Sequence, residues 1–191
     1  MGPQGPQGEI GPPGPPGPSG EPGAGGIIPF SSGTEISIGT RSGGGAGFPA
    51  FIGFGASSVS QSFLENPINL AQENTNFAFL IPRAGKLSAF SALFSTSAPH
   101  NYVNSTVTVS AQIFRGSAGN NIFLPLSPAL VLQPNYSGMV PAGSIVSASV
   151  GNLNIEINPN DRLLLVVFAN ACGEETQINL CGFVSAGLNI K

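Results

Sequence analysis

Glycine stands at every third position from Gly2 to Gly23, which makes eight unbroken Gly-X-Y triplets at the start of this 191-residue chain. Proline fills half of the X and Y positions. A collagen helix winds three polyproline-II chains, and only glycine fits where each chain crosses the crowded axis. The repeat therefore predicts a collagen-like triple helix, and the chain is expected to be one third of a homotrimer. The predicted axis positions are Gly2, Gly5, Gly8, Gly11, Gly14, Gly17, Gly20 and Gly23.

A flexible linker rich in proline and glycine is the alternative interpretation, because composition alone would allow it. A linker has no reason to keep a strict period of three, so we favour the triple helix. The triplets would span only about 75 Å at the polyproline-II rise of about 3.1 Å per residue. We expect so short a rod to depend on a trimeric domain. The pattern ends at Gly25-Gly26, which predicts a stalk over residues 1–26 and a head over residues 27–191.

The head is long enough to bury a core of its own. The whole chain is 41% apolar and 8% charged, whereas an ordinary soluble domain is roughly 25% charged. Six basic and nine acidic residues give a net charge of −3 without a basic cluster. This balance argues against a nucleic-acid partner, since such binding depends on Lys and Arg that neutralise phosphates. The longest apolar run, residues 163–169, is far shorter than the roughly 20 residues that span a bilayer, so it predicts a buried strand and no membrane insertion.

The head shows the pattern of β-strands throughout. Period-two alternation is clear in residues 106–114, 144–150 and 153–157, which is typical of half-buried antiparallel strands. Many short strands and no long helix predict an all-β antiparallel sandwich or jelly roll. One helical turn is possible between residues 61 and 74. Strands are expected near residues 34–40, 50–55, 75–81, 86–95, 105–115, 121–126, 129–133, 144–150, 152–157, 162–170 and 177–190.

Two cysteines, Cys172 and Cys181, flank a polar segment that resembles the loop of a C-terminal hairpin. A disulfide across this hairpin and two free thiols are both compatible with the sequence, and a bond between protomers is less favoured. Two cysteines with one distant histidine make a weak metal site. Glu174 and Glu175 near Asn179 have the oxygen ligands that suit calcium. A polar hairpin tip explains them better, so we predict no metal and no cofactor.

Catalytic residues are not expected. His100 is the only histidine and Asp161 the only aspartate, so a hydrolytic triad would need this pair and an oriented serine. Both residues stand in segments that resemble loops or turns. We therefore predict that the protein is not an enzyme.

Residues 77–91 contain an apolar strand, a Pro-x-x-Gly corner and a second apolar strand. This segment resembles the trimeric jelly rolls of the tumour-necrosis-factor and complement type. Residues 181–188 are similar to the closing strand of that fold, in which small residues and an aromatic pack near the threefold axis. The resemblance implies a homotrimeric jelly roll, with core or trimer-interface candidates at Phe77, Phe79, Ile81, Phe183 and Val184.

The collagen repeat and this head together resemble the collagen-like exosporium glycoproteins of spore-forming bacteria, particularly the BclB-type C-terminal domain. Residues 27–33, 51–55 and 162–167 carry the resemblance. It implies a structural surface filament on a spore exosporium or appendage, outside the cell. The stalk would point towards an anchoring protein and the globular trimer would form the tip. Stalks of this family usually repeat Gly-Pro-Thr and carry glycans on threonine, whereas this repeat has no threonine and a single serine, Ser19.

A second function shares the same fold, and fold alone does not decide function. The head would then be a receptor- or glycan-binding adhesion module at the tip of a surface or phage fibre, with a host surface or glycan as partner. Its ligand surface would be the loops near residues 96–104 and 134–143, with Tyr102 and Tyr136. No secretory signal pattern is visible at the N-terminus. An extracellular protein would therefore have lost its signal or be assembled in a cell that later lyses.

Overall fold

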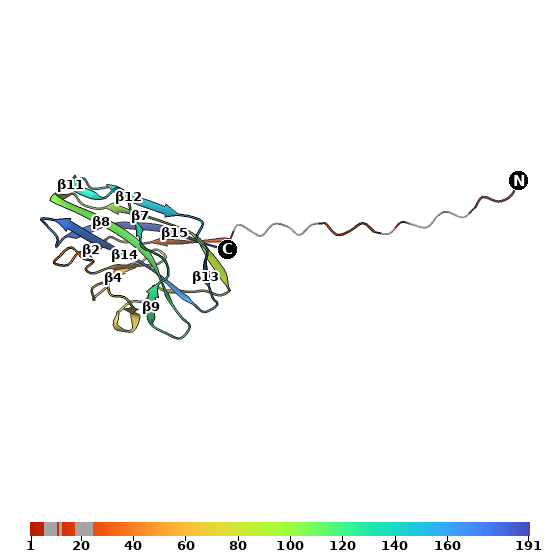
Figure 1. Cartoon of the computed structure of the whole chain (residues 1–191), viewed down its shortest axis with the longest axis horizontal. Coiled ribbons are helices and arrows are strands. Elements are labelled where there is room, and N and C mark those ends of the chain that lie inside the picture. The colour runs from red at the N-terminus through yellow and green to blue at the C-terminus, as the bar shows by residue number, and fades with distance from the viewer. Residues whose placement is uncertain (6–10, 12, 18–24) are drawn as a thin grey trace.

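The computed structural model describes residues 1–5, 11, 13–17 and 25–191, and it folds the head into two antiparallel β-sheets packed face to face (Figure 1). The described part contains no α-helix, and it has one 3₁₀ turn, η1 (Leu70–Gln72). No helix in these described ranges is long and apolar enough to cross a membrane. The head is therefore all-β.

The first sheet has the central order β1-β15-β7-β12, with β2 added beside β15 and β13 beside β7. Its strands are β1 (Gly26–Ser31), β2 (Ile36–Gly39), β7 (Gly85–Thr96), β12 (Ile145–Val150), β13 (Ile155–Ile157) and β15 (Asn179–Ile190).

The second sheet has the central order β4-β3-β14-β8-β9-β5, with β6 added beside β14 and both β10 and β11 beside β8. Two antiparallel sheets stacked in this way are consistent with the predicted jelly-roll sandwich. Its strands are β3 (Ala50–Ile52), β4 (Ser57–Val59), β5 (Ile68–Asn69), β6 (Phe79–Leu80), β8 (His100–Gly116), β9 (Ile122–Pro125), β10 (Leu130–Val131), β11 (Tyr136–Val140) and β14 (Arg162–Gly173).

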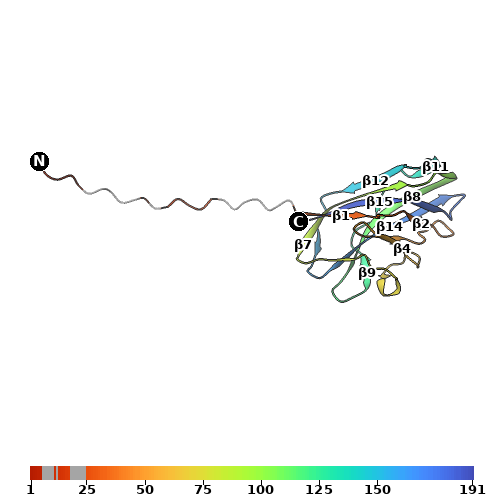
Figure 2. The same cartoon turned by 180° about the vertical axis from the view of Figure 1, so that it is seen from behind.

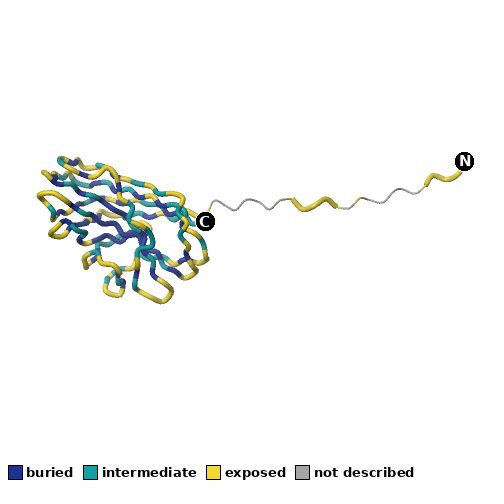
Figure 3. The backbone as a smooth tube through the Cα atoms, in the orientation of Figure 1, coloured by how far each residue is buried: buried dark blue, intermediate teal, exposed yellow. Residues whose placement is uncertain are grey.

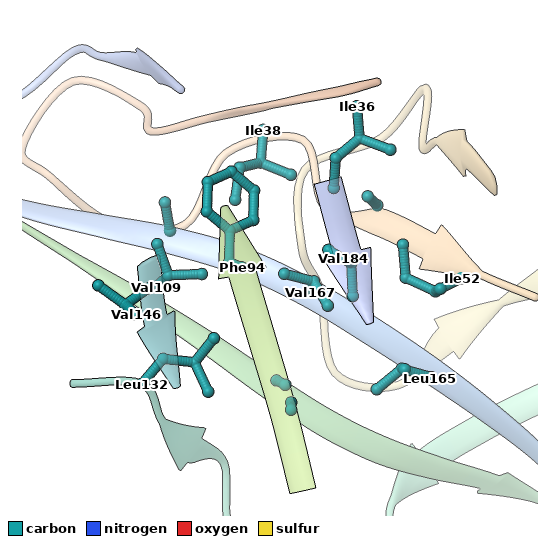
Figure 4. Close-up of a cluster of buried hydrophobic side chains, with 14 of the residues drawn as sticks. Ile36, Ile38, Ile52, Phe94, Val109, Leu132, Val146, Leu165, Val167 and Val184 are labelled. Carbon is teal, nitrogen blue, oxygen red and sulfur yellow. The ribbon is translucent and has the colours of Figure 1, made fainter. Parts of the chain in front are cut away.

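The main core lies between the sheets, where inward-facing residues of both layers interdigitate (Figure 4). Each strand contributes every second residue, as the period of two requires. The tube in Figure 3 shows the same division, with buried chain between the layers and exposed chain at the loops. Side chains in Figure 4 come from both sheets and include Ile36, Ile38, Phe94, Val109, Leu132, Val146, Leu165, Val167 and Val184.

β14 is buried on both of its faces, as its continuous apolar run predicted. Leu163, Leu165 and Val167 face the main core. Leu164, Val166 and Phe168 belong to a second apolar cluster. Residues of the segment 64–78 pack onto that cluster and keep it from water.

Four strands were missed by the sequence patterns: β1, β4, β5 and β11. β1 contains Pro29, which has no backbone N–H to donate to a ladder and is uncommon inside strands. The structure places β1 at an edge of its sheet, where proline is tolerated. β5 is only two residues long, and β4 only three, too short to show a period.

Strand β15 runs from one end of the head to the other, so its pairings identify the two ends of the head. Ile190 pairs with Gly26, and Asn179 pairs with Gly39. The end with Gly26 is called the base, because the Gly-X-Y segment joins the head there, beside the C-terminus (Figures 1 and 2). The end with Gly39 is called the tip. At about 3.4 Å per residue, β15 separates base from tip by about 37 Å.

We expect Leu165→Ala to lower the free energy of unfolding by about 2–5 kcal/mol, because it leaves a cavity between the sheets. Leu165 is completely buried. The matched control is Leu124→Ala, since Leu124 is 56% exposed and its loss should change the free energy of unfolding by no more than about 0.5 kcal/mol. Urea unfolding followed by circular dichroism measures both. Equal effects of the two substitutions would contradict this description of the core.

Candidate assembly surface

Over β1, β12, β15 and residues 89–95 of β7, the outer face of the first sheet is uncharged and carries small or apolar side chains, and the exposed ion pair of Lys86 with Glu156 in β13 lies beyond this region, nearer the base. On β15 the inward residues Val184 and Leu188 are buried, whereas Phe183 and Ser185 between them are exposed. The registers with β1, β7 and β12 continue this alternation across the sheet. None of the outward residues of this region bears a charge: Ile27, Pro29, Ser31, Ala89, Ser91, Leu93, Ser95, Ile145, Ser147, Ser149, Phe183, Ser185, Gly187 and Asn189.

A shallow depression of about 350 Å³ lies in the middle of this face. Apart from Leu93, it is lined by the serines, alanines and one glycine of three adjacent strands, β12, β7 and β15. Side chains this small let another protein surface approach the sheet closely. The larger apolar side chains of Phe183 and Ile145, which are 45% and 54% exposed, lie towards the tip side of the depression.

A second, apolar hollow of about 220 Å³ lies at the base. It is lined by the first residues of β1, by β6 and the corner after it, and by Ile190. Ile27 is 76% exposed and Leu80 is 57% exposed. Two such side chains beside one hollow form an apolar patch, which is the kind of surface that marks an interaction site. Arg83 supplies a cationic rim.

The five predicted core or interface residues have different environments. Val184 and Ile81 are buried in the main core, and Phe79 packs against it. Phe77 packs instead on the second cluster, outside any strand. Phe77 and Ile81 lie on either side of β6, which contains only Phe79 and Leu80. Phe183 alone of the five points out of the first sheet, as an interface residue would.

The expected C-terminal hairpin does not exist. β14, which contains Cys172, belongs to the second sheet, and β15, which contains Cys181, belongs to the first. Cys172 pairs with Thr106, and Cys181 pairs with Ser37. Both cysteines are free thiols in this structure. The segment between β14 and β15 crosses from one sheet to the other, which short-range alternation cannot reveal.

The tyrosines predicted on ligand loops are not on exposed loops. Tyr102 lies in β8 and Tyr136 in β11, and they are only 3% and 5% exposed. The Tyr136 hydroxyl donates a hydrogen bond of 2.9 Å to the carbonyl oxygen of Ser144. The His100 ring stacks on the Tyr102 ring at a centroid distance of 5.6 Å. Strand β8 continues to the turn before His100, so the expected loop near residues 96–104 is much shorter than predicted.

The polar residues considered for chemistry lie apart from one another. His100 begins β8, whereas Asp161 adjoins the opposite end of that strand through the pairing of Arg162 with Gly116. The Asp161 carboxylate accepts a hydrogen bond from the backbone N–H of Asn158, as a turn residue does. Among the residues that the structure describes, no three His, Cys, Asp or Glu side chains lie close enough together to hold a metal ion.

Glu174 also has a local partner, because its carboxylate accepts a hydrogen bond of 3.1 Å from the side chain of Asn104. Asn179 lies in a different hollow at the tip. Of the predicted axis glycines, Gly8, Gly20 and Gly23 lie outside the described residues. The others are exposed, and their role at a triple-helix axis stays a prediction.

No protein-family model and no curated protein matches this chain. Among solved structures, the chain is similar to the Eiger tumour-necrosis-factor protein of S. frugiperda, with a TM-score of 0.36 and 10% sequence identity. The match covers 86% of this chain and 94% of that chain. Because a TM-score at this level carries no argument, the architecture of the head rests on its own strand order and core.

The buried tyrosines predict a loss of stability in alkali. Burial raises the pKa of Tyr136 to about 12, and burial also raises the pKa of Tyr102 far above its usual range. The unfolded chain therefore releases its phenolic protons at a lower pH than the folded chain does. The free energy of unfolding should fall as pH rises above about 10, by at most about 1.4 kcal/mol per pH unit for each tyrosine.

Urea unfolding between pH 8 and about 11.5 would measure this loss. The chain has only two tyrosines, so the double variant Tyr102→Phe/Tyr136→Phe removes the whole phenolic contribution. Its pH profile should be flatter than that of the natural sequence. Parallel profiles for the two proteins would show that the tyrosines have the same pKa in the folded and the unfolded chain, which would contradict the prediction.

Proposed function

We propose that the protein is a homotrimeric, non-enzymatic structural protein of a surface filament, in which a jelly-roll head aligns three chains of a collagen-like stalk. The observation that carries the proposal is the continuity between the Gly-X-Y repeat and β1. The last repeat glycine is Gly23, and β1 begins at Gly26. β1 forms the edge of the uncharged outer face and also lines the apolar hollow at the base.

Covalent reach limits where the three heads can lie. If Gly23 stands at the axis of a triple helix, the four residues to Ile27 extend at most about 14 Å. Three copies of Ile27 would therefore lie within about 14 Å of one axis. The apolar hollows at the base, which contain Ile27, would face one another across this short distance. Burial of these side chains against copies of the chain would stabilise the trimer at the point where the stalk needs it.

The composition of the outer face suits contact with another copy. Bringing uncharged side chains together avoids the desolvation penalty of buried ions. The small residues of the central depression leave room for apolar side chains of a neighbouring head. Interfaces between identical subunits are typically more apolar than the rest of the surface. Val103 and Leu124 are also exposed, but they lie on the second sheet, away from this face.

In the filament, the stalk and the tip of the head would point in opposite directions. The stalk leaves at the base, so it would point towards an anchoring protein, and the tip would point outwards. A location on a bacterial spore exosporium or appendage is supported by the resemblance of three sequence segments to collagen-like exosporium glycoproteins. The adhesion alternative loses its two predicted tyrosines, since both rings are buried.

Light scattering of the full chain tests the trimer. The measured mass should be three times the 19.3 kDa mass of one chain. Phe183→Lys should dissociate this particle, because three cations would enter an apolar contact. Val103→Lys is the matched control, since Val103 is exposed on the second sheet, and it should leave the mass unchanged.

A monomeric full chain would overturn the proposal. A trimer that tolerates Phe183→Lys would instead show that the outer face of the first sheet is not the interface. Circular dichroism adds a second readout, since the triple-helix signal of the stalk should disappear with the trimer. The Phe183→Lys variant should still have folded β-sheets that show a thermal unfolding transition, because Phe183 is half exposed and contributes little to the core.

A further inference from the structure

A hollow of about 750 Å³ lies at the tip of the head. Its size falls within the range of about 300–1,000 Å³ that is typical of small-molecule sites. It lies where β2 ends opposite the start of β15, about 37 Å along that strand from the base. Its side chains come from three separate segments: Arg41, Ser42, Phe48, Phe63, Gln177 and Asn179.

Two phenylalanines form the apolar wall of the hollow. The Phe48 and Phe63 rings lie 4.7 Å apart between centroids and are tilted by 38°. They are 41% and 46% exposed, although most phenylalanines of the head are buried. The other exposed rings have other surroundings, since Phe54 stacks on Phe30 and Phe183 lies on the outer face of the first sheet. The exposed pair at the tip has no role in the core or in the proposed trimer.

Polar side chains with unused hydrogen-bonding capacity surround this wall. Arg41 takes part in neither of the two ion pairs of the described head, which join Lys86 to Glu156 and Arg115 to Asp161. The side-chain hydrogen bonds near the hollow are made instead by the Thr40 hydroxyl. It donates to the carbonyl of Thr176 and accepts from the N–H of Ile178. A guanidinium has five N–H donors, and an amide both donates and accepts.

The loop that carries Arg41 is held in place by its backbone. The N–H of Gly44 donates to the carbonyl of Arg41, and the N–H of Ala171 in β14 donates to the carbonyl of Gly44, at 2.9 and 2.8 Å. The N–H of Leu64 donates to the carbonyl of Gly47 and so ties the Phe63 segment to the same loop. A site whose parts are fixed before binding loses less conformational entropy when a ligand arrives.

Gly44 is essential to this arrangement. Its φ of +80° lies in the left-handed region, and a Cβ added there would collide with the carbonyl oxygen of Ala171. Residues 41–47 form a glycine-rich loop with a defined place beside the hollow. It brings one cation and one hydroxyl to the edge of an aromatic wall.

We propose that this hollow binds a pyranose sugar ring at the end of a glycan. A pyranose has a face of C–H groups and a rim of hydroxyls. The C–H face suits the electron-rich face of a phenyl ring. The hydroxyls suit the guanidinium of Arg41 and the amides of Gln177 and Asn179, which both donate and accept. Apolar walls with a few convergent polar groups are the general form of small-ligand sites.

An extended peptide fits this hollow less well. Peptides that add to a sheet need an edge with free backbone groups. Here the backbone N–H groups of Thr40, Arg41 and Gly47 donate to Ile178, Gly45 and Gly39. The hollow also lies at the tip, at the other end of β15 from the contact proposed at the base. Sugar binding would add recognition to a structural filament.

Saturation-transfer NMR of the full chain tests the site with two defined probes, methyl β-glucopyranoside and methyl β-glucopyranosiduronate. These probes differ at the C6 group, a hydroxymethyl or a carboxylate, which reports on the charge of Arg41. We expect saturation transfer to the ring protons of both probes. Ligands of about a dozen heavy atoms should bind with a Kd of about 1 mM, and the carboxylate probe should bind more tightly.

Four variants give matched comparisons. Phe63→Ala should weaken both probes at least about tenfold, whereas Phe54→Ala, at an exposed ring outside the hollow, should weaken neither. Arg41→Gln should remove the preference for the carboxylate probe, whereas Arg83→Gln at the base should preserve it. Because Phe63 and Arg41 are exposed, their variants should keep the sheet signal in circular dichroism.

The proposal is overturned if neither probe receives saturation at concentrations well above 1 mM, or about tenfold the expected Kd. It is also overturned if Phe63→Ala and Phe54→Ala weaken binding equally, or if a blocked pentapeptide competes better than both sugars. Light scattering separates this result from the trimer. A Phe63→Ala variant that dissociates into single chains would show that a second copy, not a sugar, covers the hollow.

Discussion

The packing of β14 between two apolar layers is the constraint on which the rest of the head depends. One face of this strand fills the space between the sheets, and the other supports the second cluster under residues 64–78. A strand buried on both faces cannot slip by one residue without exchanging the environment of every side chain. Its pairing with β8 continues over the full length of β14 and so fixes the register of the second sheet.

This central packing explains how a chain with so few charges remains a defined structure. Apolar side chains that would otherwise be exposed are divided between two clusters, and the remaining polarity comes mainly from neutral hydroxyl and amide groups. The two ion pairs of the described head lie near the base and leave the tip without one. The tip hollow contains the cation Arg41, whereas the depression on the outer face of the first sheet is lined only by uncharged residues.

Most of the strands could be predicted from the sequence, because alternation in β8, β12 and β13 and the continuous apolar run in β14 are local signals. What could not be predicted was which sheet each strand joins. Cys172 and Cys181 are close in sequence, but the chain crosses between the sheets in the interval, and no local pattern marks such a crossing. The same limitation placed Tyr102 and Tyr136 on loops, whereas long-range pairing of β11 with β8 buries both rings.

The tip hollow had a weaker signal in sequence. Phe48 and Phe63 are separated in the chain by two short strands, β3 and β4, and no local pattern brings them together. Their exposure follows from the loop of residues 41–47, which is anchored to β14 through Gly44 and to the Phe63 segment through Gly47. A glycine-rich segment is normally interpreted as flexible, and here its backbone bonds give it a fixed shape.

The antiparallel pairing of β1 with β15 has a mechanical consequence. The chain enters β1 at the base and runs towards the tip, so tension applied from the N-terminal side acts along the axis of the strand. The six residue pairs between Gly26 and Ser31 of β1 and Ser185 and Ile190 of β15 would be loaded in shear and would have to yield together. A strand pulled perpendicular to its neighbour releases its hydrogen bonds one after another. The edge of the first sheet is thus oriented to resist force transmitted from a tether.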